Sequence, residues 1–473
     1  MNEIQSKDLK NEELHYEYKK AKGGFPKSFF ETYSAFANTD GGYIYLGIEE
    51  TNNKKYNPSK LTLEDINSLK TNLFTLLNNQ EKVNVNLIAD EDVEEIKVDN
   101  EFVLKIHVKK CPVDLKPIYI NKNLYQGTYR RNADGDYRCS IEEINAMIRD
   151  ASRQSPDLAI VEDCSTSSLD EESIKIYKNM FSSIHPDHPF LKEDTNRFLE
   201  YIGAARLDNN DEYHPTKAGL LMFGYSYRIV YQYPSFFLDY QKKSETRWDD
   251  RVQSDSGDWS GNVFMFFLKV TNKLFENIPT PFKMEGIYRV DNDELHKAVR
   301  EALCNTLCNA DYNLTTSVAI KQYEDHIEFI NPGCLMMDID QMMNGGLSSP
   351  RNRTMLKMFN LINIGERSGS GIPLIVESSK TYNLPLPIIK EYYHPDYTSL
   401  ILYTKKPLKT NGLTKLEEDI IVYLKDNDKL SAKEISNYLN KNITTIKLTL
   451  YSLVDKGIVS SSGTIKDKKY FIK

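Results

Sequence analysis

The sequence has few cysteines, few tryptophans and no long apolar run. Its 473 residues include six Cys and two Trp, and because no two cysteines form a Cys-x-x-Cys pair, we expect neither structural zinc nor a disulfide framework. The most hydrophobic run, residues 218–223, is far shorter than the roughly 20 apolar residues of a membrane span. The polar start MNEIQSKDLKNEE lacks the apolar region of a signal peptide. We therefore expect a cytoplasmic protein with reduced thiols and no membrane partner.

An overall excess of positive charge is also missing, since the formal charge at neutral pH is -8. Any contact with nucleic acid must therefore come from local patches of cationic side chains. One such patch lies in residues 411–473, where 11 Lys and no Arg stand against 8 acidic residues, which gives a local charge of +3.

What the sequence does contain is an ordinary globular composition, with 40% hydrophobic and 27% charged residues. At about 100–200 residues per domain, the chain holds about two to four domains. Helical and strand-like periodicities occur together and predict a multidomain α/β (α+β) protein. Polar stretches at 152–168 and 410–414 are typical of linkers. We predict four domains, at residues 1–151, 169–285, 286–408 and 411–473.

The segment 27–37 predicts an amphipathic helix that ends at Asn38-Thr39-Asp40-Gly41-Gly42, and a buried strand follows at 43–48. The two glycines allow a tight turn and a close approach between helix and strand. The side chain of Asn38 is expected to bond the backbone of its own turn.

Three groups of motif residues in this first region resemble the Schlafen AlbA-like family of nucleic-acid-binding domains. Glu12 and Glu17-Tyr18-Lys19 match the opening of that family, 35–42 and Gly47-Ile48 match its core, and Pro117, Tyr129 and Arg130 match its end. The resemblance covers roughly residues 10–150. It implies an AlbA-like domain that binds nucleic acid.

Lys19, Arg130 and Arg131 are the candidate phosphate contacts of this domain. Cations that are held on a scaffold supply affinity for nucleic acid of any sequence. The alternative is that Lys19 and Arg130 neutralise Glu17 and neighbouring acids inside the domain. The sequence alone leaves both alternatives open.

Glu12, Glu17 and Glu50 stand at positions where acids form a metal-dependent RNA-cleaving site in some eukaryotic Schlafen members. Carboxylates gathered around a divalent ion orient water and stabilise the charge that develops during phosphodiester hydrolysis. Position 50 departs from the family's Asp by one methylene. We expect the three acids to meet at one edge of the sheet, in an ion-pair network with Lys19. The alternative is a metal-dependent endonuclease for RNA or DNA, with a role in phage defence.

The central region resembles RecG-like ATP-dependent regulators over about residues 195–400. The matching segments are Thr216–Gly224, Arg300–Leu303, Asn305, Asp311-Tyr312, Asn331-Pro332-Gly333, Arg351-Asn352 and Gly369-Ser370-Gly371. The resemblance implies a divergent ATPase domain of the GHKL superfamily. In such a domain Asn305 would hold Mg²⁺, Glu301 would activate water, and the bound nucleotide would lie against Gly333, Gly369, Ser370 and Gly371.

Spacing supports part of this assignment. Glu301 and Asn305 are four residues apart and so are neighbours on one helical face. Backbone N–H groups at the start of the helix after Gly369 suit a phosphate group. The adenine-binding Asp of the superfamily is missing, however, and Asn331 stands in its place. We therefore expect ATP and Mg²⁺ to bind weakly, if at all, with slow turnover.

The C-terminal region resembles a winged helix. Helices are predicted at 416–424, 431–439 and 442–455, followed by a hairpin of strands 458–461 and 469–472. Ser431 and Glu434 predict a capping box. Along the third helix five apolar residues recur at helical spacing and should point inward: Ile443, Ile446, Leu450, Leu453 and Val454.

Such a domain places its third helix in the major groove of DNA and its wing against phosphates. Thr444, Thr445, Lys447 and Lys468 are the candidate contacts. The alternative is a winged helix that binds protein, because the segment has no Arg for a bidentate guanine contact.

These features together predict a nucleic-acid-binding regulator, specifically a homodimeric transcriptional regulator of double-stranded DNA with a degenerate ATP-binding domain. The metal-dependent nuclease remains the first alternative. A nucleotide-gated scaffold whose winged helix binds protein is the second.

Overall fold

The computed structural model divides the chain into two compact units, Met1–Pro156 and Asp157–Lys473. Each unit combines helices with β-sheets, which confirms the predicted α/β multidomain class. Among the residues described, no helix is long and apolar enough to cross a membrane. The structure describes residues 3–12, 14–51, 55–152, 154–243, 248–276, 278, 284–285, 288–289, 293–365, 369–406, 414–425, 427, 429–439, 441–462 and 468–472.

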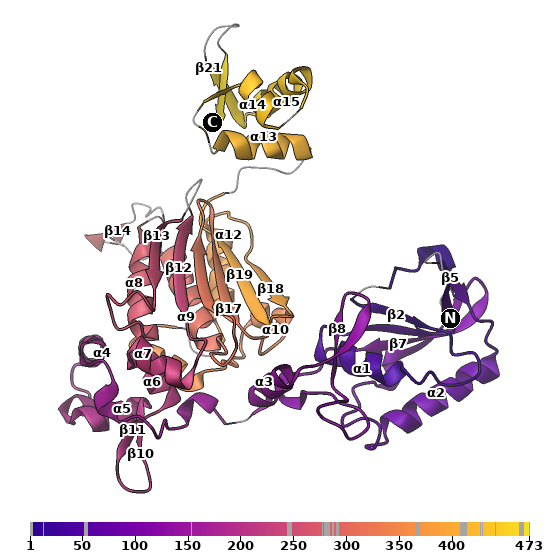
Figure 1. The fold of residues 1–473 in the computed structure, drawn as a ribbon, viewed down its shortest axis with the longest axis horizontal. Coiled ribbons are helices and arrows are strands. Elements are labelled where there is room, and N and C mark those ends of the chain that lie inside the picture. Colours follow the sequence, from indigo (N-terminus) through magenta and orange to yellow (C-terminus); the bar gives the residue numbers. More distant parts are fainter. Residues whose placement is uncertain are drawn as a thin grey trace. The chain divides into compact units, whose positions relative to one another are not determined.

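The N-terminal unit is built on a five-stranded sheet with the strand order β1-β6-β7-β3-β2 (Figure 1). Strand β2 runs parallel to β3 and β1 parallel to β6, whereas the other neighbours are antiparallel. Because successive side chains alternate between the two faces, Glu17 and Lys19 lie on the face opposite to Tyr18. The strands are β1 (Glu3–Ile4), β2 (Tyr16–Lys19), β3 (Gly42–Leu46), β6 (Val93–Val98) and β7 (Glu101–Val108).

Helices α1 (Phe29–Asn38) and α2 (Leu63–Leu77) supply the apolar side chains that form one core with this sheet. The turn after α1 confirms the predicted role of the two glycines. Gly41 has a φ of +74°, and a Cβ atom there would lie 2.7 Å from the carbonyl oxygen of Val108. A Cβ atom on Gly42 would lie 2.8 Å from the ring of Phe36. The helix and strand can approach this closely only because both residues are glycine.

Asn38 makes different bonds from those predicted. Its amide nitrogen donates to the carbonyl oxygens of Ile118 and Tyr129, at 2.8 and 3.0 Å, and its side-chain oxygen accepts the N–H of Ile118 at 2.8 Å. The prediction of a bond within its own turn was therefore wrong. Asn38 is fully buried, so its amide must satisfy backbone groups of a segment that is distant in sequence.

Shorter elements complete the N-terminal unit. The hairpin of β8 and β9 carries Arg130 and Arg131 beside α1, and helix α3 begins with a capping box between Ser140 and Glu143. These elements are β4 (Ile48–Thr51), β5 (Lys55–Pro58), β8 (Tyr129–Asn132), β9 (Gly135–Arg138) and α3 (Ile141–Ala151).

A six-stranded sheet with the order β13-β12-β16-β17-β19-β18 organises the second unit. Strand β12 runs parallel to β16, and the other neighbours are antiparallel. Thus a strand of the region predicted as 169–285 pairs directly with one of the region 286–408, and both regions contribute to a single hydrophobic core. The strands are β12 (Leu238–Lys243), β13 (Trp248–Gln253), β16 (Val318–Gln322), β17 (His326–Pro332), β18 (Ile388–Tyr392) and β19 (Tyr397–Tyr403).

Helix α9 packs against both α8 and α12, and α8 and α9 contact the sheet (Figure 1). Helix α9 begins at an N-cap, Asp293, whose carboxylate accepts the N–H of His296 at 3.0 Å. The helices of this unit are α4 (Glu171–Ile184), α5 (Thr195–Ile202), α6 (Lys217–Phe223), α7 (Ser226–Gln232), α8 (Val263–Phe275), α9 (Glu294–Asn309), α10 (Ile339–Asn344), α11 (Arg353–Leu361) and α12 (Gly371–Thr381). Short strands β10 (Ala205–Leu207) and β11 (Tyr213–Pro215) form a hairpin, as do β14 (Met284–Glu285) and β15 (Tyr288–Arg289).

The C-terminal residues form three helices and a three-stranded sheet with a hydrophobic cluster of their own. The capping box of Ser431 and Glu434 is present. Ile446, Leu450 and Leu453 are fully buried as predicted, but Ile443 is 40% exposed because it lies in the first turn of its helix. The elements are α13 (Lys415–Lys425), β20 (Leu430–Ser431), α14 (Ala432–Tyr438), α15 (Ile443–Asp455), β21 (Val459–Ser462) and β22 (Lys469–Ile472).

Candidate functional sites

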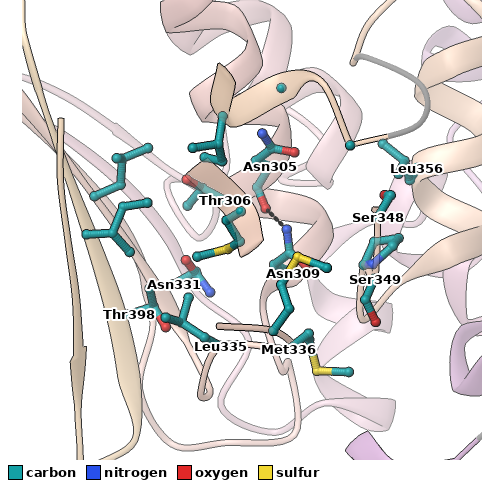
Figure 2. A pocket seen from close by; sticks show the side chains of 18 of the residues that line it. Asn305, Thr306, Asn309, Asn331, Leu335, Met336, Ser348, Ser349, Leu356 and Thr398 are labelled. Carbon is teal, nitrogen blue, oxygen red and sulfur yellow. Dashed lines mark hydrogen bonds between the residues drawn. The ribbon is translucent and has the colours of Figure 1, made fainter. Parts of the chain in front are cut away.

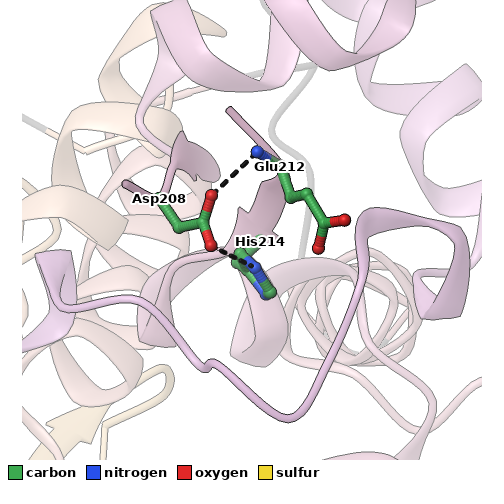
Figure 3. A group of neighbouring side chains, drawn as sticks. All are labelled: Asp208, Glu212 and His214. Atoms are coloured by element: carbon green, nitrogen blue, oxygen red, sulfur yellow. Dashed lines mark hydrogen bonds and ion pairs between the residues drawn. The ribbon is translucent and has the colours of Figure 1, made fainter. Parts of the chain in front are cut away.

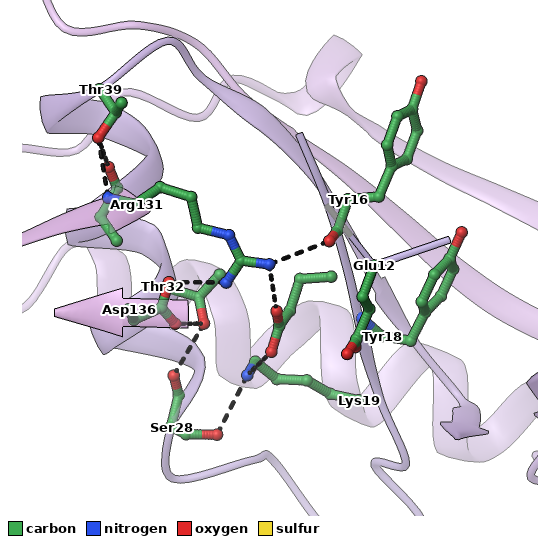
Figure 4. A network of polar contacts seen from close by, with 11 residues as sticks. Glu12, Tyr16, Tyr18, Lys19, Ser28, Thr32, Thr39, Arg131 and Asp136 are labelled. Carbon is green, nitrogen blue, oxygen red and sulfur yellow. Dashed lines mark hydrogen bonds and ion pairs between the residues drawn. The ribbon is translucent and has the colours of Figure 1, made fainter. Parts of the chain in front are cut away.

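The predicted phosphate contacts of the N-terminal unit lie inside it and pair with its own acids (Figure 4). One carboxylate oxygen of Glu17 lies 2.8 Å from Lys19 Nζ, and the other lies 2.9 Å from a guanidinium nitrogen of Arg131. A second Arg131 nitrogen lies 2.9 Å from Asp136. Lys19 is 9% exposed and Arg131 only 1%. A phosphate at the surface does not reach a guanidinium that is buried to this degree, so the geometry favours internal neutralisation.

Arg130 follows the same pattern. It is 2% exposed, and its guanidinium lies 3.2 Å from the carboxylate of Glu143, the residue that also caps helix α3. Arg130 therefore ties the hairpin β8–β9 to α3.

Of the three predicted acids, Glu12 and Glu50 meet, whereas Glu17 is held by cations. The Glu12 carboxylate accepts the backbone N–H of Tyr18 at 2.9 Å, and the Glu50 side chain is near enough to raise the pKa of Glu12. Burial, with the charges of Glu17 and Glu50, raises the pKa of Glu12 to about 7. In the part of the chain that is described, the three acids do not form a group whose ligand atoms all lie within 4.8 Å of one another.

A cavity of about 130 Å³ lies between the sheet of the second unit, helix α9 and the start of α12 (Figure 2). Asn331 of β17 and Thr398 of β19, which are directly opposite each other in the sheet, provide polar groups on its sheet side. Apolar side chains form much of the wall: Leu335, Met336, Met337, Met342, Ile389 and Leu400.

The predicted nucleotide-binding residues Glu301, Asn305, Gly369 and Gly371 all line this cavity. Glu301 is 5% exposed and accepts a hydrogen bond from the amide nitrogen of Asn305 at 3.1 Å. A Cβ atom on Gly369 would lie 1.9 Å from the carbonyl oxygen of Leu347, and one on Gly371 would lie 2.2 Å from Glu301 Oε1. The backbone of Leu347 leaves no room for a side chain at Gly369, whereas a Cβ atom on Gly371 would displace the end of the Glu301 side chain.

Gly333 and Ser370 occupy supporting positions. Ser370 is the N-cap of α12. Gly333 accepts a hydrogen bond from Thr398 Oγ1 at 2.9 Å, and a Cβ atom on it would lie 2.8 Å from the guanidinium of Arg351.

Arg351 and Asn352 tie the wall of the cavity to the end of α9. The Arg351 guanidinium donates to the carbonyl oxygen of Asn309 and, at 2.8 Å, to that of Cys334. The Asn352 amide donates to the carbonyl oxygens of Cys308 and Ala310, at 3.0 and 2.8 Å. These bonds satisfy the last carbonyl groups of a buried helix.

Comparison with known proteins identifies three regions of the chain. Residues 12–140 match the family "Schlafen, AlbA_2", and residues 315–399 match the family "Putative ATP-dependent DNA helicase recG C-terminal". A domain of unknown function, DUF8451, matches residues 145–239. These matches confirm the Schlafen AlbA-like and RecG-like resemblances. The RecG C-terminal match contains Asn331, Thr398 and the glycines, but it begins after helix α9.

Two solved structures are similar to the chain. The crystal structure of the DIP2311 protein from Corynebacterium diphtheriae is 16% identical, with a TM-score of 0.42, and the match covers 97% of this chain and 92% of that one. The solution structure of the N-terminal domain of a putative ATP-dependent DNA helicase RecG-related protein from Nitrosomonas europaea is 29% identical, with a TM-score of 0.20. That match covers 27% of this chain and 82% of the other. No curated protein matches the chain.

The DUF8451 region contains a group of side chains that sequence reasoning missed (Figure 3). Asp208, Glu212 and His214, in the hairpin β10–β11, place ligand-type atoms within 4.8 Å of one another. The Asp208 carboxylate accepts the N–H groups of Asn210 and Glu212, both at 2.8 Å, and the bond from Glu212 contributes most to lowering its pKa. These bonds account for Asp208 as a residue that shapes the turn, and we assign no metal to this group of side chains.

The predicted DNA contacts of the C-terminal helix lie at the surface. Thr444, Thr445 and Lys447 are exposed on α15. Lys468 Nζ lies 5.2 Å from the ring centre of Tyr451, which belongs to α15. Residues 463–467, which include the tip of the predicted wing, lie outside the described residues.

Proposed function

We propose that the protein is a DNA-binding transcriptional regulator that also binds a nucleotide. The observation that carries the DNA-binding part is the surface of α15. Its apolar residues Ile446, Leu450 and Leu453 are buried, whereas Thr444, Thr445 and Lys447 face solvent. The helix therefore has a buried apolar face and an exposed side that carries Leu448 and Tyr451 as well as these polar residues.

The surrounding elements support a winged-helix assignment. Three helices are followed by two antiparallel strands, β21 and β22, and a short strand before α14 completes the sheet. In this arrangement the third helix enters the major groove and the strands' cations meet phosphate. The local charge of +3 in residues 411–473 favours the same partner. The match of residues 12–140 to Schlafen, AlbA_2 adds a second region of a nucleic-acid-binding type.

The lining of the cavity in the second unit supports the proposal that the protein binds a nucleotide. Apolar walls suit a flat base, and the Asn331 side chain offers both a donor and an acceptor. The bond from Asn305 to Glu301 uses the amide nitrogen. This leaves the amide oxygen of Asn305 as an atom of the kind that Mg²⁺ takes as a ligand. The donor set therefore fits ATP with Mg²⁺, with Glu301 beside it as the residue to activate water.

A gel-shift titration of the full chain with labelled duplex DNA, at two salt concentrations and with or without ATP and Mg²⁺, tests this proposal. We expect binding that weakens as salt rises, because phosphate contacts release counterions. Absence of any salt-sensitive binding to duplex DNA would refute the regulator and leave the exposed Leu448 and Tyr451 of α15 as a surface for protein. A two-fold symmetric complex would support the homodimer that duplex-DNA readers commonly form.

The second candidate function is the metal-dependent endonuclease. The neighbouring carboxylates of Glu12 and Glu50 favour it, because neighbouring acids provide oxygen ligands for a divalent ion once they are deprotonated. The pairing of Glu17 with Lys19 and Arg131 opposes it. Incubation with labelled tRNA and single-stranded DNA in Mn²⁺ tests this function, which requires cleavage that Glu17→Ala abolishes.

A further inference from the structure

A second and more open cavity of about 510 Å³ adjoins the first one. The two share three lining residues, Ser348, Pro350 and Leu356. Figure 2 shows Ser348 and Leu356 on the side of the first cavity opposite to Asn331 and Thr398. The open cavity therefore continues the first one away from the sheet.

The two cavities differ in charge. Helix α11 contributes Arg353 and Lys357 to the open cavity, together with Asn360, and none of the described residues that line it is acidic. Arg353 and Lys357 are four residues apart, so they lie on one face of the helix, and both are exposed. Among the described residues that line the first cavity there is no cation, and the carboxylate among them is that of Glu301.

This combination points to a ligand with an apolar or amide-bonding part at one end and anionic groups at the other. We propose that Arg353 and Lys357 bind the terminal phosphates of the nucleotide whose base lies beside Asn331 and Thr398. The proposal rests on the nucleotide binding proposed above and adds selectivity for a nucleoside triphosphate over the monophosphate.

The chemistry of the two cations suits this role. An arginine binds a phosphate through two parallel N–H bonds, and a lysine adds a point charge. Lys357 Nζ donates one hydrogen bond, at 3.1 Å, to the neutral carbonyl oxygen of Tyr201. An ammonium group has three donors, so this bond does not exhaust its capacity.

Calorimetric titration of the full chain with AMP, ADP and ATP in Mg²⁺ tests the proposal. For the wild type we expect affinity to rise from AMP to ATP, and the difference to shrink as salt screens the charges. In the double variant Arg353→Gln with Lys357→Gln, ATP affinity should fall about tenfold or more, as expected when charge-assisted bonds are removed, and AMP affinity should stay unchanged. Lys380→Gln, an exposed lysine of α12 outside both cavities, is the matched control.

The outcomes separate this inference from the proposal on which it rests. If the wild type binds none of the three nucleotides, nucleotide binding itself fails. If it binds AMP and ATP equally, or if the folded double variant binds ATP as the wild type does, the terminal-phosphate subsite is wrong while the first cavity remains a nucleotide site. If the double variant loses duplex-DNA binding but binds ATP as the wild type does, the subsite is also wrong, because the open cavity would then hold the DNA backbone. Lys357→Arg, which keeps the charge, should retain ATP affinity.

Discussion

The Oε2 atom of Glu17 lies 2.9 Å from a guanidinium nitrogen of Arg131, although the two residues lie far apart in the sequence of the N-terminal unit. Glu17 belongs to the first strand of the family motif and Arg131 to the last hairpin. Lys19 and Asp136 extend this pair into an alternating network of two acids and two cations. The network joins β2 to the hairpin β8–β9 and holds the N-terminal unit together through buried charge.

Removing Arg131 should destabilise the N-terminal unit strongly. Arg131→Met leaves the buried charge of Glu17 and Asp136 with less compensation, and breaking a buried ion pair in this way costs about 3–5 kcal/mol. Thermal or urea unfolding of the full chain measures the loss. Lys20→Met is the control, because it breaks the exposed pair of Lys20 and Glu49, whose side chains are 55% and 48% exposed, and should change the free energy of unfolding little. Equal effects of the two substitutions would contradict the role of the network.

The N-terminal fold was largely accessible from the sequence because its signals are local. The helix at 27–37, the double glycine and the strand after it depend on neighbours within a few residues. The partners of Asn38 and Arg131 are set by the packing of distant segments, and a single sequence contains no trace of that packing. For this reason sequence reasoning named Arg131 as a candidate phosphate contact and assigned the Asn38 side chain to its own turn.

Asn305→Ala should remove the Mg²⁺-dependent part of ATP binding and leave the rest. The side-chain oxygen of Asn305 is the proposed ligand, so the variant should bind ATP in Mg²⁺ only as tightly as the wild type binds ATP in EDTA. Calorimetry under both conditions measures this. An equal loss of affinity with and without Mg²⁺ would show that Asn305 shapes the cavity through its bond to Glu301 instead.

The cavity was predicted only in part. The spacing of Glu301 and Asn305 and the run Gly369-Ser370-Gly371 are visible along the chain, since each is confined to one turn of structure. Thr398 was missed because it becomes a partner of Asn331 only through the register of β17 and β19. The cations of α11 were missed for the same reason, because Ser348 and Leu356 connect them to the cavity only in the folded chain.

Reversing two charges on the proposed DNA-binding surface should weaken DNA binding by the full chain. Lys447→Glu with Lys468→Glu replaces two attractive interactions with phosphate by repulsion. The slope of the logarithm of affinity against the logarithm of salt concentration should fall in magnitude by about 2, close to one unit for each lysine that no longer neutralises a phosphate. Lys433→Glu, an exposed lysine of α14, changes the charge elsewhere in the same domain and should have a smaller effect. An unchanged slope in the double variant would remove α15 from the interface.

The last prediction concerns the raised pKa of Glu12. Burial raises the pKa of Glu12 in the folded protein to about 7 from an ordinary value of 4.5. Below pH 4.5 the Glu12 carboxyl is protonated in both the folded and the unfolded chain, so its raised pKa costs no stability. Between pH 4.5 and pH 7 the folded chain binds more protons than the unfolded chain, so the free energy of unfolding falls as the pH rises. Above pH 7 Glu12 is ionised in both states, and the free energy of unfolding stays at the lower value. Glu12→Gln imitates the protonated form and should remove this part of the slope when urea unfolding is compared at pH 5 and pH 8.

A divalent ion would reverse this behaviour. If Mn²⁺ bound between Glu12 and Glu50, it would displace the proton of Glu12, lower the pKa of Glu12 and stabilise the protein most at high pH. We expect no such effect, because Glu17, the third acid of the predicted nuclease, is occupied by Lys19 and Arg131. Urea unfolding at pH 8 with and without Mn²⁺ therefore distinguishes the two candidate functions without a nuclease assay. Stabilisation by Mn²⁺ in the wild type that disappears in Glu12→Gln would establish a metal site and favour the endonuclease.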